Sequence, residues 1–363
     1  MGIDDKLQQL REKLDETPVN KATETERGRL KARIAELEDE KEQRAKETGG
    51  STSGYAVEKK GDATVALVGK PSVGKSTLLN QLTNADSETG SYEFTTLDVV
   101  PGMLQYNGAN IQILDVPGLI GGAAEGRGDG TQVLSVVRNA DLVLMMAAPD
   151  ELDGFDQMEE ELYDAGIRLD VEPPKVKITR KDAGGLDIAS TVDQTHLDDD
   201  TIREVLQERG LVNASVTLRE DITLDRLIDA VTANREYIPS LKAVNKVDQI
   251  DSGGQQELAE EYPDAVFISA ETGKGLDELK QRVWEGLGLM RVYMKKPGKE
   301  PDRDEPLIVD RGASVKDVMD RLAGDFSRFK HARIWGDSAD FPEQRVGEDH
   351  VLQDRDVLEL RTR

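Results

Sequence analysis

A nine-residue segment, Gly69-Lys-Pro-Ser-Val-Gly-Lys-Ser-Thr77, limits what this chain can fold into more than any other feature. It matches the pattern Gly-x-x-x-x-Gly-Lys-Ser and lies between a strand-like run, 63–68, and a helix-like run from Ser76. Glycines let backbone N–H groups close around phosphate oxygens, and a helix N-terminus favours negative charge. We therefore expect Lys75 to reach the β- and γ-phosphates of a nucleotide, and the Ser76 hydroxyl to bind Mg²⁺. The predicted phosphate-binding residues are Gly69, Lys70, Pro71, Ser72, Val73, Gly74, Lys75, Ser76 and Thr77.

Further strand-like runs predict a second motif beside this loop. Residues 111–115 and 141–146 are typical of buried strands that alternate with helices, which predicts a mostly parallel sheet. The first of these runs leads into Asp115-Val-Pro-Gly118. We expect Asp115 to hold Mg²⁺ through water and the Gly118 N–H to contact the γ-phosphate. Val116 and Pro117 are expected to line the same nucleotide site.

A third motif, Asn245-Lys-Val-Asp248, follows another buried strand and resembles the guanine-specificity motif of GTPases. The Asp248 carboxylate can accept hydrogen bonds from the N1–H and the exocyclic amine of guanine. Adenine lacks that pair of donors, so we expect ATP to leave a buried carboxylate unpaired. The stem of Lys246 is expected to cover the face of the base, and a backbone N–H at Ser269-Ala270 is expected to meet the guanine oxygen. Together with Asn245, these residues predict GTP as the bound nucleotide.

Two segments between these motifs are predicted to respond to the γ-phosphate. Phe94-Thr-Thr-Leu97 lies where a first switch loop belongs, and we expect Thr96, with Thr95 as its rival, to close onto Mg²⁺ and the γ-phosphate. Residues 118–130 contain six glycines and are predicted to form the second switch. The alternatives are an ordinary strand for the threonines and an ordinary surface loop for the glycines. The expected catalytic residues are Lys75, Thr96 and Gly118.

The rest of the sequence predicts parts outside the nucleotide domain. Before residue 50, apolar residues recur at helical spacing in two stripes separated by Pro18, which predicts a helical hairpin. This hairpin is expected either to pack on the nucleotide domain or to bind a partner. From Gly166 the alternation of strands and helices changes, and it resumes at Leu241. The predicted fold class is α/β, with an N-terminal helical region (1–60), a P-loop nucleotide domain in two parts (61–166 and 235–290), an inserted α+β domain (167–234) and a C-terminal β-grasp module (291–363).

Composition narrows the chemistry and the environment. The chain has no cysteine and three histidines, which excludes disulfides and thiol catalysis and argues against a histidine-built metal site. Its longest apolar run, 142–149, is too short to cross a bilayer, so we expect a soluble, cytoplasmic protein. The net charge of −25 favours adaptation to a salty cytoplasm over an ordinary acidic surface. Residues 291–363 are nearly neutral, with 15 basic and 16 acidic residues, which favours contact with RNA there.

With these motifs assembled, almost the whole chain closely resembles the developmentally regulated GTP-binding protein family, within the Obg-like GTPases. The most specific segments are Asn20-Lys-Ala-Thr-Glu24, Gly118-Leu-Ile-Gly-Gly-Ala-Ala-Glu-Gly126, Arg219-Glu-Asp221 and Arg345-Val-Gly347. The resemblance implies a helix-turn-helix N-terminal region, a GTPase domain interrupted by a domain like one in a ribosomal small-subunit protein, and a C-terminal TGS domain. It also implies Mg²⁺ as a cofactor and association with ribosomes or RNA through the TGS domain, with no membrane and no specific DNA partner.

Three residues bear on the expected rate of GTP hydrolysis. Leu119 stands where Ras-like enzymes carry a water-positioning glutamine, so we expect slow intrinsic turnover that a ribosome, a partner or a monovalent cation accelerates. Related potassium-activated GTPases carry asparagine where this chain has Ser72, which weakens the case for K⁺, although a hydroxyl can still ligate a cation. Arg127 is a further candidate for stabilising charge in cis. The leading hypothesis is a regulatory GTPase in translation; the alternatives are an ATPase of the Obg-like group and a nucleotide-switched adaptor for protein partners.

Overall fold

The computed structural model describes residues 2–21, 23–48, 59–83, 99–116, 130–232, 234–322, 326 and 329–362 of the chain. The chain divides into two compact units. Unit 1 comprises Met1–Tyr55 and Gly166–Tyr237, and unit 2 comprises Ala56–Ala165 and Ile238–Arg363. Each unit therefore draws on segments that are far apart in the sequence. Within the described ranges, no helix is both long enough and apolar enough to cross a membrane.

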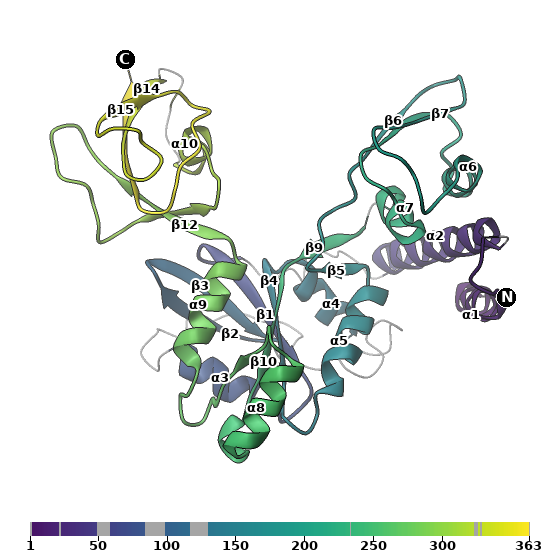
Figure 1. The fold of residues 1–363 in the computed structure, drawn as a ribbon, viewed down its shortest axis with the longest axis horizontal. Coiled ribbons are helices and arrows are strands. Elements are labelled where there is room, and N and C mark those ends of the chain that lie inside the picture. The colour runs from purple at the N-terminus through teal and green to yellow at the C-terminus, as the bar shows by residue number, and fades with distance from the viewer. Residues whose placement is uncertain are drawn as a thin grey trace. The chain divides into compact units, whose positions relative to one another are not determined.

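A six-stranded sheet forms the centre of the P-loop domain in unit 2, in the order β11-β10-β4-β1-β3-β2 (Figure 1). Its strands are β1 (Ala63–Gly69), β2 (Val100–Tyr106), β3 (Ala109–Asp115), β4 (Leu142–Ala147), β10 (Ser240–Val244) and β11 (Val266–Phe267). Neighbouring strands are parallel except for β2 and β3. Every residue of β1 and β4 is buried, as expected for parallel strands that are covered on both faces. The predicted mostly parallel sheet is confirmed, whereas the hairpin strand β2 was not anticipated.

Helices cover both faces of this sheet (Figure 1). On one face, the leucines of α3 (Lys75–Leu82) and α9 (Leu276–Gly286) share a core with Leu67, Ile113 and Leu144 of the sheet. Helices α4 (Gly130–Arg138) and α5 (Asp153–Asp164) lie on the other face, and α8 (Ser252–Glu261) follows β10. The parallel strands all end at one edge of the sheet, so the loops after β1, β3, β10 and β11 meet there. That carboxyl edge is where ligands bind in open α/β sheets.

The C-terminal module of unit 2 has the predicted β-grasp fold. Its sheet has the order β13-β12-β16-β14-β15, formed by β12 (Leu289–Met294), β13 (Leu307–Asp310), β14 (Phe329–Trp335), β15 (Gln344–Val346) and β16 (Asp356–Thr362). Strands β12 and β16 are parallel, and the other neighbours are antiparallel. Helix α10 (Val315–Arg321) starts after Ser314, whose hydroxyl accepts a hydrogen bond from the Asp317 N–H, as in a capping box. Val318 and Met319 of this helix pack on one face of the sheet.

Unit 1 joins two regions that the sequence suggested separately, the N-terminal helices and the inserted domain. The N-terminal helices are α1 (Ile3–Glu16) and α2 (Glu24–Thr48). The inserted domain has a three-stranded sheet in the order β6-β8-β7 and two helices. Its elements are β6 (Val176–Arg180), β7 (Leu186–Ser190), α6 (Asp199–Glu208), β8 (Ala214–Leu218) and α7 (Leu224–Val231).

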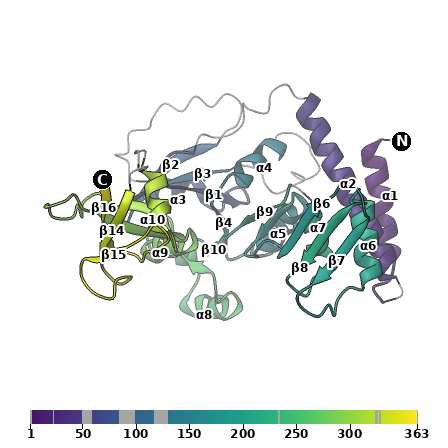
Figure 2. The ribbon, with the colours of Figure 1, turned by 90° about the horizontal axis from the view of Figure 1, so that it is seen from above.

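The packing of α2 corrects one expectation. Leu7 of α1 packs against Ile34 and Leu37 of α2, which closes the hairpin. Ala32 and Ala35, elsewhere on α2, belong instead to the core of the inserted domain, and α2 lies beside α6 (Figure 2). The sequence suggested the nucleotide domain or a separate partner for this hairpin. Its packing partner in unit 1 is the inserted domain, because small alanines let the two sets of helices approach closely.

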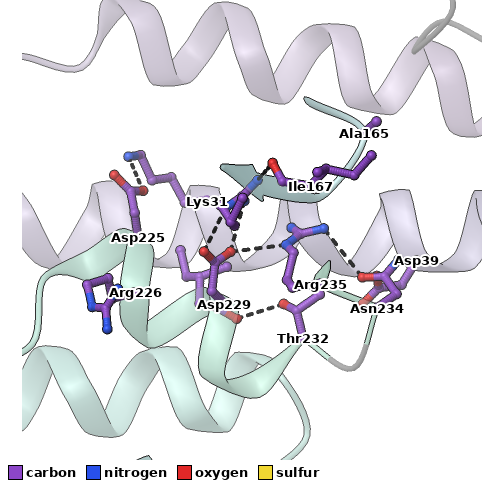
Figure 3. Close-up of polar contacts among 12 residues, drawn as sticks. Lys31, Asp39, Ala165, Ile167, Asp225, Arg226, Asp229, Thr232, Asn234 and Arg235 are labelled. Carbon is purple, nitrogen blue, oxygen red and sulfur yellow. Dashed lines mark hydrogen bonds and ion pairs between the residues drawn. The ribbon is translucent and has the colours of Figure 1, made fainter. Parts of the chain in front are cut away.

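A buried ion-pair cluster lies at the neck of the inserted domain, where β5 (Ile167–Leu169) pairs with β9 (Glu236–Ile238) (Figure 3). The Asp229 carboxylate of α7 accepts two hydrogen bonds from Arg168, at 2.7 and 2.9 Å, and one from Arg235, at 3.0 Å. The exposed fractions of these side chains are 8% for Asp229, 7% for Arg168 and 9% for Arg235. We call these three residues the neck cluster. Because these side chains are buried, removing one charge would leave the opposite charges of the cluster without a partner that offsets their loss of hydration.

Candidate functional site

The predicted phosphate-binding loop follows β1 at the carboxyl edge of the central sheet. Gly74 caps the start of α3 with a φ of +100°, a left-handed conformation that favours glycine. A Cβ atom on Gly74 would lie 2.5 Å from the Asn245 amide nitrogen, and one on Gly69 would lie 2.4 Å from the Met146 carbonyl oxygen. Both glycines are therefore required by close approach to neighbouring strands and loops, in addition to the backbone access that a phosphate needs.

The Lys75 side chain lies over this loop. Its ammonium donates hydrogen bonds to the carbonyl oxygens of Gly69, at 2.8 Å, and Lys70, at 3.1 Å. Burial lowers the pKa of Lys75, and the negative charge of Asp115 partly opposes that shift. The lysine is thus held at the loop by two carbonyls, close to where the N–H groups at the start of α3 point. A phosphate there would meet a localised positive charge and the positive end of the helix dipole.

Ser76 and Asp115 come together beside Lys75. The Ser76 hydroxyl donates a hydrogen bond to the Asp115 carboxylate at 2.8 Å, and Asp115 is 7% exposed at the end of β3. Strand pairing explains this meeting, because β3 lies next to β1 and Asp115 is in register with Leu67. A hydroxyl and a carboxylate are ligands that Mg²⁺ accepts, and Mg²⁺ usually takes few protein ligands and completes its shell with water and phosphate. No cluster of three or more acidic, histidine or cysteine side chains competes for it within the described residues.

Asn245 connects the loop to the predicted base-binding segments. Its side-chain amide donates to the Val73 carbonyl at 2.8 Å and accepts from the Ala270 N–H at 2.8 Å. The residue is 2% exposed, and its own N–H donates to the Ala147 carbonyl at 2.9 Å. One asparagine therefore holds three loops in a fixed relation to one another.

The segment with the predicted guanine-specificity motif forms a tight turn after β10. Lys246 has a φ of +64°, and Asp248 lies in the short 3₁₀ helix η2 (Val247–Gln249), where it is exposed. The Asp248 carboxylate is therefore accessible to the edge of a base, and its selection of guanine over adenine stays a prediction.

The Ser269–Ala270 segment is held internally. The Ser269 N–H donates to the Lys274 carbonyl at 2.9 Å, and the Ser269 hydroxyl accepts from the Thr272 N–H at 3.2 Å. The Ala270 N–H donates to the Asn245 side chain. Both backbone N–H groups are thus already satisfied within the protein, and a contact between this segment and a guanine oxygen stays a prediction.

The remaining predicted site residues take three kinds of position. Val73 and Val116 are buried, and the Val116 N–H donates to the Leu67 carbonyl at 3.0 Å. The exposed members are Pro71, Ser72 and Thr77. Several predicted residues lie outside the described ranges, and their roles stay predictions: Thr95, Thr96, Pro117, Gly118, Leu119 and Arg127.

Asp153, which contacts the phosphate-binding loop, could not be predicted from the sequence. The Lys70 ammonium reaches the Asp153 carboxylate at 3.3 Å, in the first turn of α5. The Lys70 side chain thereby turns to α5, while its carbonyl accepts from Lys75. Asp153 lies 83 positions further along the chain and belongs to no recognisable motif, so only the folded structure reveals this ion pair.

Comparisons with known proteins agree with this geometry. A family model described as a 50S ribosome-binding GTPase matches residues 64–181, a model of the C-terminal region of that GTPase domain matches 183–289, and a TGS-domain model matches 290–362. The developmentally-regulated GTP-binding protein 2 of Bos taurus is 42% identical over 99% of this chain and 99% of that protein. This chain belongs to the developmentally regulated GTP-binding protein family.

Two archaeal relatives are more similar still. An uncharacterised GTP-binding protein of Halobacterium salinarum is 52% identical over 99% of both chains. Another, from Methanocaldococcus jannaschii, is 52% identical over 99% of this chain and 93% of that protein. Family membership identifies the P-loop domain as a GTPase domain and the C-terminal module as a TGS domain. The strongly acidic composition agrees with the halobacterial relative.

The Asn245 bridge gives a direct prediction for this GTPase domain. Replacing Asn245 with alanine leaves the buried Val73 carbonyl and Ala270 N–H without their partner, at about 1–3 kcal/mol for each group. We expect the Kd for GDP to rise about 10- to 100-fold, measured by calorimetry. Asn245→Asp is the matched comparison, because it keeps the acceptor for Ala270 but loses the donor to Val73, and an intermediate loss is expected. An alanine variant that binds GDP like the parent protein would contradict the bridging role.

Proposed function

We propose that this protein hydrolyses GTP slowly and acts as a regulatory switch that associates with ribosomes or RNA through its TGS domain. One observation carries the proposal. Lys75, the Ser76–Asp115 pair and the Asn245 bridge lie along a single edge of the sheet, after β1, β3 and β10. This arrangement supports one continuous site for the phosphates, the metal and the base of GTP.

The chain's own residues supply positioning and charge, on which phosphoryl transfer mainly depends. Lys75 brings a positive charge to the loop, and the start of α3 adds N–H donors. Mg²⁺ held by Ser76 and Asp115 would neutralise charge that develops on the β- and γ-phosphate oxygens. Leu119 carries no group that can orient water. The attacking water therefore depends on backbone groups, on a cation or on an external partner.

Two observations support a ribosomal or RNA partner over an isolated enzyme. The matching family model for the GTPase domain is described as ribosome-binding, and a TGS domain follows it. The TGS domain also lacks the acidic excess of the rest of the chain. Residues 291–363 include 15 basic and 16 acidic residues, whereas the net charge of the whole chain is −25. A surface that faces nucleic-acid phosphate has a physical reason to avoid acidic side chains.

The expected result is slow turnover by the isolated protein. Without a water-positioning side chain, we expect kcat between about 10⁻⁴ and 10⁻² s⁻¹ in sodium buffer, the range of unaided small GTPases. Ribosomes or K⁺ should raise that rate at least about tenfold. Single-turnover assays in matched sodium and potassium salts, with and without ribosomes, measure both effects. Fast hydrolysis by the isolated protein in sodium buffer would show that the switch proposal is wrong.

Ribosome association is tested separately by co-sedimentation. We expect more protein in the ribosomal pellet with a non-hydrolysable GTP analogue than with GDP or with no nucleotide, because a switch must bind its target differently in its two states. The matched control is Lys75→Ala, which should pellet equally under all three conditions. Equal pelleting of the parent protein under all three conditions would argue against nucleotide control of binding.

A further inference from the structure

The TGS sheet has one face that α10 does not cover. Side chains alternate between the two faces of a strand, and Val292, Ala332 and Leu358 on one face share a core with α10. Residues at the intervening positions of β12, β14 and β16 therefore point to the opposite face. Arg345 of β15, which is in register with Arg333, lies on the same face. We call this surface the open face, and its cationic and aromatic residues include Lys295, His331, Arg333, Trp335, Arg345 and Arg361.

Like charges stand opposite one another on the open face. Arg333 of β14 is in register with Arg345 of β15 on one side and with the buried Glu359 of β16 on the other. Like charges placed directly across a strand pair destabilise a sheet. Arg333 shares its charge with Glu343 at 3.0 Å, but the exposed Arg345 has no ion pair among the described residues. The arginine pair Arg333–Arg345 is therefore suited to binding an anionic group of a ligand.

The surroundings of His331 report the same excess of positive charge. The pKa of His331 is lowered, first by burial and then by the cations Arg345, Lys330, Arg333 and Arg361. Two carboxylates lie beside these cations: Glu359, whose side chain is 2% exposed, is 3.2 Å from Lys295 and 2.6 Å from Arg361, and Glu343 is 3.0 Å from Arg333. Arg345 is thus the exposed arginine of this face whose charge no carboxylate among the described residues balances, in a chain whose net charge is −25.

Flat aromatic rings lie next to these cations. The Lys295 ammonium is 4.9 Å from the centre of the Trp335 ring, and the Arg303 guanidinium is 5.8 Å from that of Tyr293. Tyr293 and Trp335 are each in register with Val357, so they stand on the two strands that flank β16. Aromatic rings on a sheet, bordered by lysine and arginine, are suited to stacking of unpaired bases with phosphates alongside.

We propose that the open face of the TGS sheet binds single-stranded RNA, with a base stacked at Trp335 and phosphates beside Arg333, Arg345 and Arg361. The proposal rests on the RNA or ribosome association in the proposed function, and it specifies the surface and the form of RNA. Single strands are favoured over duplexes because a duplex hides the faces of its bases. RNA is favoured over a protein partner because the cross-strand pair of Arg333 and Arg345, with Arg361 nearby, matches a chain of phosphates.

The test uses the full-length protein, a short fluorescent oligouridylate and the same sequence annealed as a duplex, over a KCl titration. Arg345→Glu should weaken binding of the single strand at least about tenfold and flatten the dependence of log K on log [KCl] by about 0.7 per lost phosphate contact. Trp335→Ala should weaken binding about 10- to 100-fold with little change in that slope. Lys316→Glu, on the exposed side of α10, makes the same change of charge and should weaken binding less than about threefold.

The outcomes separate this proposal from the proposed function. Far-UV circular dichroism and thermal unfolding first show that each variant is folded. If Arg345→Glu and Trp335→Ala bind oligouridylate like Lys316→Glu, the open face is the wrong surface. Tighter binding of the duplex than of the single strand would also overturn the proposal. So would a parent protein that binds no oligouridylate together with an Arg345→Glu variant that no longer co-sediments with ribosomes, because that combination indicates a protein contact at the open face. If the parent protein binds neither ribosomes nor RNA, the proposed association fails as well.

Discussion

Replacing Lys75 with alanine should lower kcat/KM for GTP hydrolysis by about 10²- to 10³-fold, the loss typical when one group that stabilises transition-state charge is removed. The physical reason is local. The Lys75 ammonium is held by the Gly69 and Lys70 carbonyls at the start of α3, while the other lysine of the loop, Lys70, turns its ammonium to Asp153. Its removal also leaves those two carbonyls without their donor. Single-turnover hydrolysis at saturating and at limiting GTP separates the loss in binding from the loss in the chemical step.

Two further variants make this result specific. Lys280→Ala removes a lysine from α9 whose ion pair with Asp277 is largely exposed, and hydrolysis should change less than about twofold. Lys75→Arg keeps the charge but not the shape, because a planar guanidinium cannot replace a compact ammonium between two carbonyls. We expect it to recover only part of the lost activity. If Lys75→Ala hydrolyses GTP within about threefold of the parent protein, the loop is not the site of phosphate charge neutralisation.

Replacing Asp229 with alanine should destabilise unit 1 by about 3–5 kcal/mol, because it removes the buried carboxylate with which both Arg168 and Arg235 pair. The neck cluster lies where the inserted domain joins β5 and β9, so the loss should concentrate in those strands and in α7. Native-state hydrogen exchange read by mass spectrometry measures the free energy of opening of each segment in the full chain. The amides of β1 and β4, in the core of unit 2, provide an internal reference.

The chain offers a closely matched control for Asp229. Asp225 lies one turn earlier on α7 and pairs with Lys31, but its side chain is 50% exposed. Asp225→Ala should cost about 0–1 kcal/mol, as exposed ion pairs do. Asp229→Asn should fall between the two, since it keeps acceptor oxygen but loses charge. Equal protection factors in the Asp225 and Asp229 alanine variants would mean that burial of the neck cluster contributes nothing to the stability of unit 1.

The sequence predicted the strand, loop and helix around residues 63–82 well because their determinants are local. Gly69, Gly74, Lys75 and Ser76 lie within eight positions, and their loop needs only a strand before it and a helix after it. Asp115 is 39 positions from Ser76, yet the strand pattern placed the two together, because parallel strands end at the same edge of the sheet. The role of Asp248 in selecting guanine stays a prediction, because it depends on how a bound base covers this turn.

Other contacts had no counterpart in sequence patterns. The stripe on α2 showed that a face is apolar but not which core would take Ala32 and Ala35. The register that sets Arg333 against Arg345 depends on where β15 begins, which a three-residue strand does not reveal. The tie between Asn245 and Val73 spans 172 positions. Hydrophobic periodicity predicts which face of an element a side chain lies on. It does not predict which of several chemically similar residues elsewhere in the chain that side chain will contact.

The sequence by itself therefore determined the P-loop, the mostly parallel sheet and the β-grasp order, because short-range geometry and strand periodicity specify them. Only the tertiary structure decided which charges meet: Arg168 and Arg235 with Asp229, and Lys70 with Asp153. The physical reason is that the energy of an ion pair depends on distance and burial. Both quantities exist only after the strands and helices have packed.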